Sequence, residues 1–306
     1  MSSIRRRGFT LVELLVVAML IALLASISLA ALAGALEDAK RTRTRAVVAK
    51  LHSLIMTKWE SYHTRRIPVR VQYSDPNTYR SLVNRLRVFA LRDLQRMEMP
   101  DRYSDILNNP VASAYGMNAP LLPLPQPALQ KAYRRRLTAS YNTAFEGAEC
   151  LYLILSMPNE DGSNSLEFLS EGEVGDYDND GMPEIWDGWK YPIYFLRWPA
   201  GFTSEIQTRD PKKGGDAFDP YFIDDANRTH YTLYPLIFSA GPDGAYDVGP
   251  EIASTITPAT GTTPPCNPYA SGALGMIGQP RDSNSNGRDE WYDNIHNHLI
   301  DAGRQQ

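Results

Sequence analysis

The chain has 306 residues, of which 43% are hydrophobic, and its formal net charge at pH 7 is −4. This hydrophobic content supports a packed globular part, and the length allows one or two domains. The small acidic excess argues against a nucleic-acid-binding protein, which usually presents a basic face.

The amino terminus combines a basic patch with a long apolar stretch. Arg5, Arg6 and Arg7 precede an uncharged run from Leu14 to Leu36. About 20 such residues are enough to cross a bilayer as a helix, and the arginines indicate that the end before the run stays in the cytoplasm. A secretory signal peptide would have a shorter apolar core followed by a small-residue cleavage site. We therefore expect one membrane-spanning helix.

Glu13 lies at the start of this apolar stretch. A carboxylate inside a membrane span costs a few kcal/mol, and it therefore indicates a functional role. The alternative is that Glu13 lies at the membrane interface and extends its carboxylate into water.

Residues 7–17 read Arg-Gly-Phe-Thr-Leu-Val-Glu-Leu-Leu-Val-Val, which resembles the class III signal of type IV pilins and type II secretion pseudopilins. The resemblance implies that a prepilin peptidase cuts the chain between Gly8 and Phe9 and then methylates the new amino terminus at Phe9. Glu13 matches the acid that is proposed, in this family, to pair with the terminal amine of a neighbouring subunit. Such a pair would make the buried charge tolerable.

The same resemblance implies a location and a set of partners. The chain would cross the inner (cytoplasmic) membrane once, with its head in the periplasm or in a filament. Its partners would be prepilin peptidase, other pilin or pseudopilin subunits that contact it through the amino-terminal helix, and an inner-membrane assembly platform. The filament would be a type II secretion pseudopilus or a type IV pilus-like fibre.

After a leader at residues 1–8, we expect a transmembrane and stem helix over residues 9–67. Pro68 should end it, because a proline ring clashes with the preceding helical turn. The second half of this helix carries apolar residues at three- and four-residue steps, which is typical of an amphipathic helix. These residues are Ala46, Val47, Leu51, Leu54, Ile55 and Trp59.

Residues 68–157 are predicted to form a helical insert. Within it we expect helices over residues 79–97 and 141–156. The segment 120–127 contains four prolines, and it is predicted to be an extended connector. A small major pilin would have no such insert, whereas a large minor pseudopilin could.

Residues 158–306 are predicted to form a β-rich head, so that the fold class is α+β with a small antiparallel sheet. Short apolar runs at 191–198 and 231–238 are the strand candidates. Pro192 and Pro235 cannot donate to a β-ladder, so these strands should start late, carry bulges or lie at an edge.

The segment 176–187 has the spacing of a calcium-binding loop. Oxygen ligands at alternating positions, a glycine at the turn and acids at the ninth and twelfth positions suit a hard cation. The predicted ligands are Asp176, Asp178, Asp180, the main-chain carbonyl of Met182, Glu184 and Asp187. The alternative is a solvated loop in which Asp and Asn side chains bond to the backbone.

Two weaker calcium candidates follow. The segment 282–293 repeats the spacing with Asp282, Asn284, Asn286 and Asp293. Residues 187–194 and 239–244 resemble two segments of the major pseudopilin head, although Lys190 stands where that family has glycine. In that family the second segment and a downstream acidic segment bind calcium, which implies Asp243 and Asp293 as ligands here. Asp243 could equally form a turn.

The remaining residues provide little chemistry. Cys150 lies in an apolar run and is predicted to be buried, and a disulfide with Cys266 is left open. The sequence contains no Gly-x-Ser-x-Gly, phosphate-binding glycine loop or His-Glu-x-x-His motif, and we therefore expect no enzyme. His296 and His298 fall in a segment, 294–301, that is predicted to be helical, where their side chains would diverge.

These observations predict a structural subunit of a pilin-like filament, with calcium ordering the loops of its head. The alternative is a membrane-anchored calcium-dependent binding or adhesion protein that uses the stem only as a tether. An anchored hydrolase with a metal in the acidic loops is a third and weaker reading.

Overall fold

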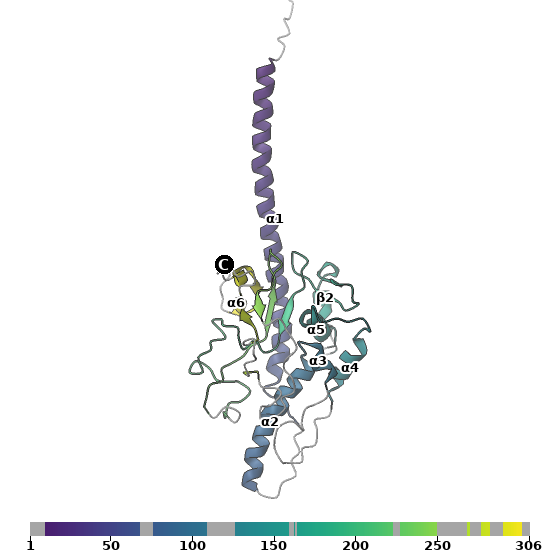
Figure 1. The fold of residues 1–306 in the computed structure, drawn as a ribbon, viewed down its shortest axis with the longest axis vertical. Helices are drawn as coiled ribbons and strands as arrows, with labels where there is room; N and C mark the ends of the chain where they lie inside the picture. The colour runs from purple at the N-terminus through teal and green to yellow at the C-terminus, as the bar shows by residue number, and fades with distance from the viewer. Residues whose placement is uncertain are drawn as a thin grey trace, which may run out of the picture.

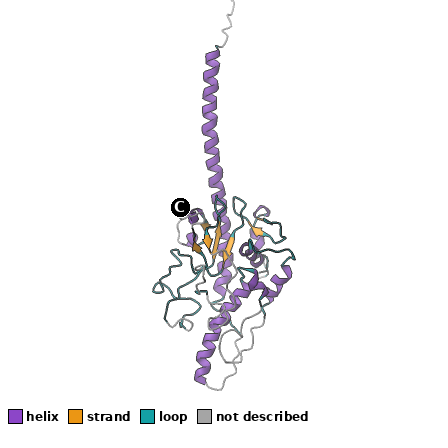
Figure 2. Cartoon of the chain, in the orientation of Figure 1, coloured by secondary structure: helices purple, strands orange, loops and turns teal. Residues whose placement is uncertain are grey.

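The computed structural model describes residues 10–67, 76–108, 126–158, 162, 164–222, 227–249, 268–269, 277–281 and 290–301. One long helix, α1, projects from a head of shorter helices and small sheets (Figure 1). The predicted α+β class is confirmed, and helices and loops outweigh strands in the head (Figure 2).

Helix α1 spans Leu11–Ser61 and has 51 residues, which corresponds to a length of about 75 Å. Its second half packs into the head through a stripe of buried side chains. They are Thr44, Val47, Val48, Leu51, Ile55 and Trp59. The predicted stripe is therefore largely confirmed, except that Ala46 is exposed and Val48 is buried in its place. The helix ends seven residues before Pro68, which lies outside the described residues.

Four α-helices lie between the stem and the first strand in the described part of the chain: α2 (Pro76–Glu98), α3 (Tyr103–Leu107), α4 (Ala128–Arg136) and α5 (Glu146–Leu155). Helix α2 agrees with the helix predicted over 79–97. Helix α5 begins five residues later than predicted, because Asn142 donates its backbone N–H to Asp180 Oδ2 at 2.7 Å instead of entering a helix. The part of the predicted connector at residues 120–125 lies outside the described residues.

The main sheet has three antiparallel strands in the order β3–β4–β7. Strand β3 (Tyr194–Leu196) pairs with β4 (Leu236–Ser239), and β4 pairs with β7 (Ile295–His296). Both predicted strands start after their proline, as expected. The prediction of a helix over 294–301 is wrong for its first part, where pairing with β4 makes Ile295 and His296 a strand, and α6 (His298–Asp301) follows.

Smaller elements complete the head. The two-stranded sheets are β1 (Val174–Gly175) with β2 (Glu184–Ile185), and β5 (Val248–Gly249) with β6 (Gln279–Pro280). The described 3-10 helices are η2 (Ser165–Phe168), η3 (Glu171–Glu173) and η4 (Glu290–Asp293).

The stem, the helices of the insert and the sheet share one hydrophobic core. Leu51 of α1, Leu153 of α5 and Ile237 of β4 belong to the same buried cluster. Cys150 is buried in this cluster, as predicted, and is a free thiol. Cys266 lies outside the described residues. Because the core includes α1, the head cannot be separated from the stem without exposing apolar surface.

A buried ion-pair network links the insert to β3. Arg197, which is 1% exposed, donates from Nη1 to Asp105 Oδ2 at 2.8 Å and to the carbonyl of Met99 at 2.7 Å. Its backbone N–H donates to Asp101 Oδ2 at 3.0 Å. Arg102 and Arg96 also pair with these two aspartates, at 3.1 and 3.8 Å, so removing Arg197 would take away part of the compensation of two buried charges.

Candidate functional site

The described chain begins at Thr10, so Gly8 and Phe9 of the predicted cleavage site lie outside it. Thr10 caps α1: its Oγ1 accepts from the N–H of Glu13 at 3.2 Å. Glu13 Oε2 in turn accepts from the N–H of Thr10 at 2.9 Å. This reciprocal capping box holds the Glu13 carboxylate at the amino-terminal end of the helix, where the helix dipole favours a negative charge.

The first half of α1 has no partner within the described chain. Fifteen large apolar side chains between residues 11 and 36 are 48–82% exposed. A contiguous apolar surface of this size marks a contact with membrane or protein. Among the described residues, α1 is the one helix that is long and apolar enough to cross a membrane, which fits a membrane-anchored protein.

The head is attached to the middle of α1 by polar contacts as well as by the core. The N–H of Gly188 donates to Thr44 Oγ1 at 2.9 Å, and Trp189 Nε1 donates to Glu37 Oε1 at 2.9 Å. Both contacts lie just beyond the exposed apolar half of the helix. The head therefore begins where the apolar surface ends. The second half of α1 contacts the head, and the first half remains exposed for contact with a membrane or another protein.

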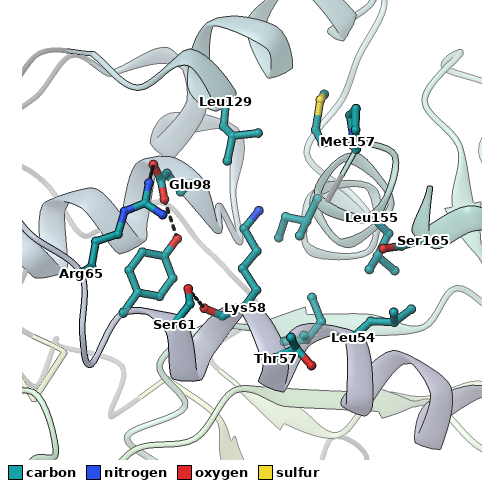
Figure 3. Close-up of a pocket in the computed structure, with 14 residues that line it drawn as sticks. Leu54, Thr57, Lys58, Ser61, Arg65, Glu98, Leu129, Leu155, Met157 and Ser165 are labelled. Atoms are coloured by element: carbon teal, nitrogen blue, oxygen red, sulfur yellow. Dashed lines mark hydrogen bonds and ion pairs between the residues drawn. The ribbon is translucent and has the colours of Figure 1, made fainter. Parts of the chain in front are cut away.

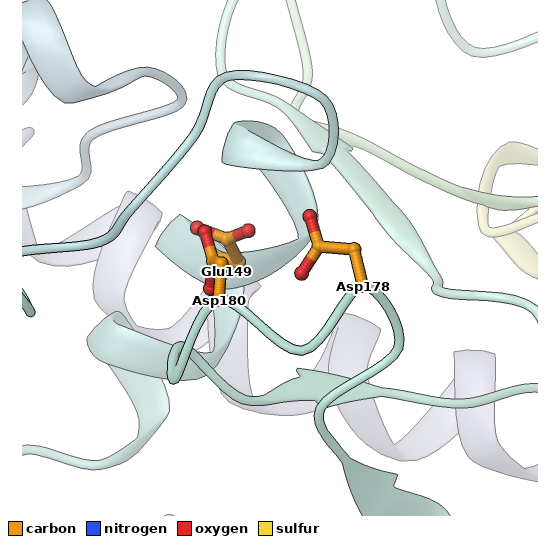
Figure 4. A group of neighbouring side chains, drawn as sticks. All are labelled: Glu149, Asp178 and Asp180. Carbon is orange, nitrogen blue, oxygen red and sulfur yellow. The ribbon is translucent and has the colours of Figure 1, made fainter.

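A second group of functional candidates is a cluster of carboxylates. The loop between β1 and β2 contains Asp176, Asp178 and Asp180, and β2 begins with Glu184. Helix α5 contributes Glu149 (Figure 4). Carboxylate oxygens of Glu149, Asp178 and Asp180 lie within 4.8 Å of one another, and so do those of Asp176, Asp178 and Glu184.

The loop backbone holds most of these acids in place. Asp176 accepts from the N–H of Asp180 at 3.2 Å and from that of Gly181 at 3.0 Å. Asp180 Oδ1 accepts from the N–H of Met182 at 2.8 Å. Gly181 has φ +89°, a backbone conformation that glycine adopts without strain. These bonds are those of the alternative Asx-turn loop, and they leave other oxygens uncommitted.

The uncommitted oxygens are buried. Glu149 and Glu184 are both 0% exposed. Within the described chain, both carboxylate oxygens of Glu149, Oδ1 of Asp178 and Oε1 of Glu184 have no hydrogen-bond partner. A buried polar group without a partner costs about 1–3 kcal/mol, and more if it is charged.

Crowding of the acids shifts their proton affinity. Burial, reinforced by Asp180 and Glu184, raises the pKa of Glu149 to about 9. Burial and the neighbouring aspartates raise the pKa of Glu184 to about 7, although the N–H of Tyr177 opposes this. A hard divalent cation would pair the orphaned oxygens and reverse these shifts. The donor set, made entirely of oxygen, fits such an ion.

The structure does not bring all the predicted ligands together. The Asp187 carboxylate points elsewhere: it accepts from the N–H groups of Trp189 and Tyr191 at 2.8 and 2.9 Å and from Ser239 Oγ at 2.6 Å. Glu149 was not among the predicted ligands. The one signal that the sequence offers for Glu149 is its place as an acid directly before the apolar run that begins at Cys150.

The weaker calcium candidates are placed only in part. Asp282, Asn284 and Asn286 lie outside the described residues. Asp293 is close to the 241–244 turn, because a Cβ built on Gly241 would lie 2.8 Å from the Asp293 carbonyl oxygen. Burial, together with Asp243 and Asp247, raises the pKa of Asp293. Asp243 itself accepts from the N–H of Ala245 at 2.9 Å, as a turn former does.

A family model of the prokaryotic N-terminal methylation motif matches residues 4–29. This motif is the class III signal of type IV pilins and pseudopilins. The motif indicates a pilin-like precursor that prepilin peptidase processes and that assembles with other pilin subunits. It therefore suggests a structural subunit rather than an enzyme. No curated protein and no solved structure matches the chain.

Proposed function

We propose that this chain is a structural subunit of a type II secretion pseudopilus or a type IV pilus-like filament. The observation that carries this proposal is the apolar first half of α1, which the head leaves uncovered and which overlaps the methylation motif at residues 4–29. Such a surface is stable in a bilayer before assembly. In a filament, neighbouring helices would bury the same surface.

The proposal includes a location and a set of partners. The chain crosses the inner membrane once, with Arg5–Arg7 on the cytoplasmic side and the head outside the cytoplasm. Prepilin peptidase cuts after Gly8 and methylates Phe9. Glu13 then pairs with the amino terminus of a neighbouring subunit, and an inner-membrane platform inserts the processed chain into the filament.

Processing and assembly can be tested separately in cells that contain a prepilin peptidase. Gly8→Ala should accumulate as the uncut precursor, visible by its mobility and its amino-terminal sequence. Glu13→Ala should be cut normally but should not enter sheared filaments. Glu60→Ala is the matched control, because Glu60 is an exposed acid on the docked part of the same helix.

The control should be processed and assembled like the wild type. Cleavage of Gly8→Ala at the wild-type position would contradict the processing step. Normal assembly of Glu13→Ala would contradict the role of the carboxylate. A wild-type chain that is cut but remains dispersed in the membrane would instead favour the tethered binding protein.

We also propose that the carboxylate cluster holds calcium. The orphaned oxygens of Glu149 support this assignment, because a cation would link α5 to the β1–β2 loop. At a calcium concentration 100 times the Kd, a bound ion would stabilise the fold by about 2.7 kcal/mol. Asp178→Asn should abolish the calcium-dependent rise in Tm, because Asp178 belongs to both groups of acids.

Glu171→Gln is the control for this test, because Glu171 is an exposed acid of the same region. It should retain the calcium response. Calorimetry with calcium and with magnesium would identify the ion. A wild-type Tm that is the same in calcium and in chelator would refute the calcium site and leave the filament proposal untouched.

A further inference from the structure

A cavity of about 400 Å³ lies where the stem meets the insert (Figure 3). The end of α1 forms one wall, and the ends of α2 and α5 and the start of α4 form the others. Most of the lining is apolar, and its apolar side chains include Leu54, Ile55, Leu129, Ile154, Leu155 and Met157. The volume falls within the range of about 300–1,000 Å³ that is usual for small-molecule pockets.

One cation reaches into this apolar space. Figure 3 shows the side chain of Lys58 extending from α1 into the cavity, toward Leu129 and Leu155. Its Nζ donates to Tyr133 Oη at 3.3 Å. Tyr133 donates its own proton to the carbonyl of Glu98 at 2.9 Å, which leaves its oxygen free to accept from Lys58.

The ammonium group has more donors than this contact uses. A lysine has three N–H donors, and the contact with Tyr133 occupies one of them. Burial lowers the pKa of Lys58 to about 8, with Glu98 opposing the shift and Arg65 adding to it. At neutral pH most molecules still have a charged Lys58, so that a cation faces the apolar walls.

Glu98 is the one acid among the described lining residues, and both of its oxygens already have partners. Glu98 Oε1 accepts from Arg65 Nη2 at 2.9 Å, and Glu98 Oε2 accepts from Tyr62 Oη at 3.0 Å. The Arg65–Glu98 pair is neutral as a whole, so among the described lining residues Lys58 adds one positive charge that this pair does not balance. The complement of such a cavity is one negative charge attached to an apolar body.

We propose that this cavity binds a small amphiphilic carboxylate, whose carboxylate pairs with Lys58 and whose apolar body packs against the leucine and isoleucine walls. The pair would compensate the half-buried cation, and the apolar walls would exclude water from the tail. The ligand would contact α1, α2, α4 and α5 together. It would therefore strengthen the attachment of the insert to the stem, a role independent of filament assembly.

The test uses the full chain purified in a neutral maltoside detergent, with octanoate as the probe and octan-1-ol as its uncharged counterpart. Lys58→Met removes the charge and keeps an unbranched side chain that is one atom shorter. Lys40→Met, on an exposed part of the same helix, is the control. Binding is measured by titration calorimetry, and the Tm of each variant without ligand verifies that it is folded.

We expect saturable octanoate binding by the wild type and by Lys40→Met, and at least a tenfold weaker affinity in Lys58→Met. Octan-1-ol should bind weakly and equally to all three, since it lacks the charge. Equal octanoate affinity in wild type and Lys58→Met, or no saturable binding to a folded wild type, would overturn the proposal. If Lys58→Met does not fold, Lys58→Gln replaces it with the same expected loss.

The source of the carboxylate is a separate arm of the experiment. Protein purified without octanoate is denatured and extracted, and the extract is analysed by mass spectrometry. A fatty acid that is recovered from wild type but not from Lys58→Met would identify a lipid-derived ligand. An empty wild type that binds octanoate would indicate a free carboxylate instead.

Discussion

Gly188 provides the sharpest test of how the head is attached to the stem. It lies in the turn that follows Asp187, directly against the backbone of α1. A Cβ at this position would lie 2.4 Å from the carbonyl oxygen of Lys40 and 2.9 Å from its Cα. We therefore expect Gly188→Ala to destabilise the docked state without touching the exposed apolar half of the helix.

The size of the effect follows from the geometry. Ordinary contact begins at 3.4 Å, so the two backbones must separate by about 1 Å. Neither can yield easily, because one is a helix and the other is a turn held by the Asp187 carboxylate. Overpacking of this kind costs about 1–3 kcal/mol. Loss of the Gly188–Thr44 hydrogen bond adds about 0.5–1.5 kcal/mol.

A combined loss of roughly 2–4 kcal/mol should lower the Tm of a protein of this size by about 5–15 °C. Thermal unfolding of the full chain in maltoside, followed by tryptophan fluorescence, measures it, because Trp189 lies in the same turn and bonds to Glu37. Gly34→Ala is the control, since a Cβ at Gly34 meets nothing within 4 Å. An unchanged Tm and emission in Gly188→Ala would refute the reasoning.

Three further predictions concern buried ionisable side chains, and thermal or urea unfolding measures each of them. Burial raises the pKa of Glu149 to about 9. In the presence of chelator, this group therefore lowers the free energy of unfolding as pH rises from about 4.5 toward 9. Glu149→Gln should flatten that decline, and an unchanged slope of stability against pH would contradict the prediction. Burial lowers the pKa of His298 to about 3. The stability that the neutral imidazole contributes is therefore lost as pH falls from 6.5 toward 3, and His298→Gln should reduce this loss of stability. Arg197→Met removes one of the two arginines that pair with each of the buried Asp101 and Asp105 and should cost about 3–5 kcal/mol. The exposed Arg135→Met should cost little, and equal effects of the two substitutions would refute the network's role.

Local chemistry explains what was predictable in this chain. The apolar run, the arginines before it and Glu13 lie within one short segment, so their meaning does not depend on the fold. The stripe that includes Leu51 and Ile55 follows from helical periodicity alone. The late start of the two central strands follows from Pro192 and Pro235, because a proline removes a backbone donor wherever it lies.

The helix boundaries show where local reasoning failed. Asn142 was expected in the first turn of a helix, but its N–H bonds to an acid almost forty residues later in the chain. Ile295 and His296 were expected in a helix, but pairing with β4 makes them a strand. In both cases a long-range hydrogen bond outweighs a weak local preference.

The sequence by itself determined the long apolar helix, the N-terminal methylation motif and the acidic character of the β1–β2 loop, because each depends on residues that are neighbours in the chain. Only the tertiary structure decided which acids converge. It brought Glu149 from α5 to the loop and committed Asp187 to a turn. It also placed Lys58 in an apolar cavity. Convergence of this kind depends on how helices and loops pack in three dimensions, and spacing along the chain carries no record of that packing.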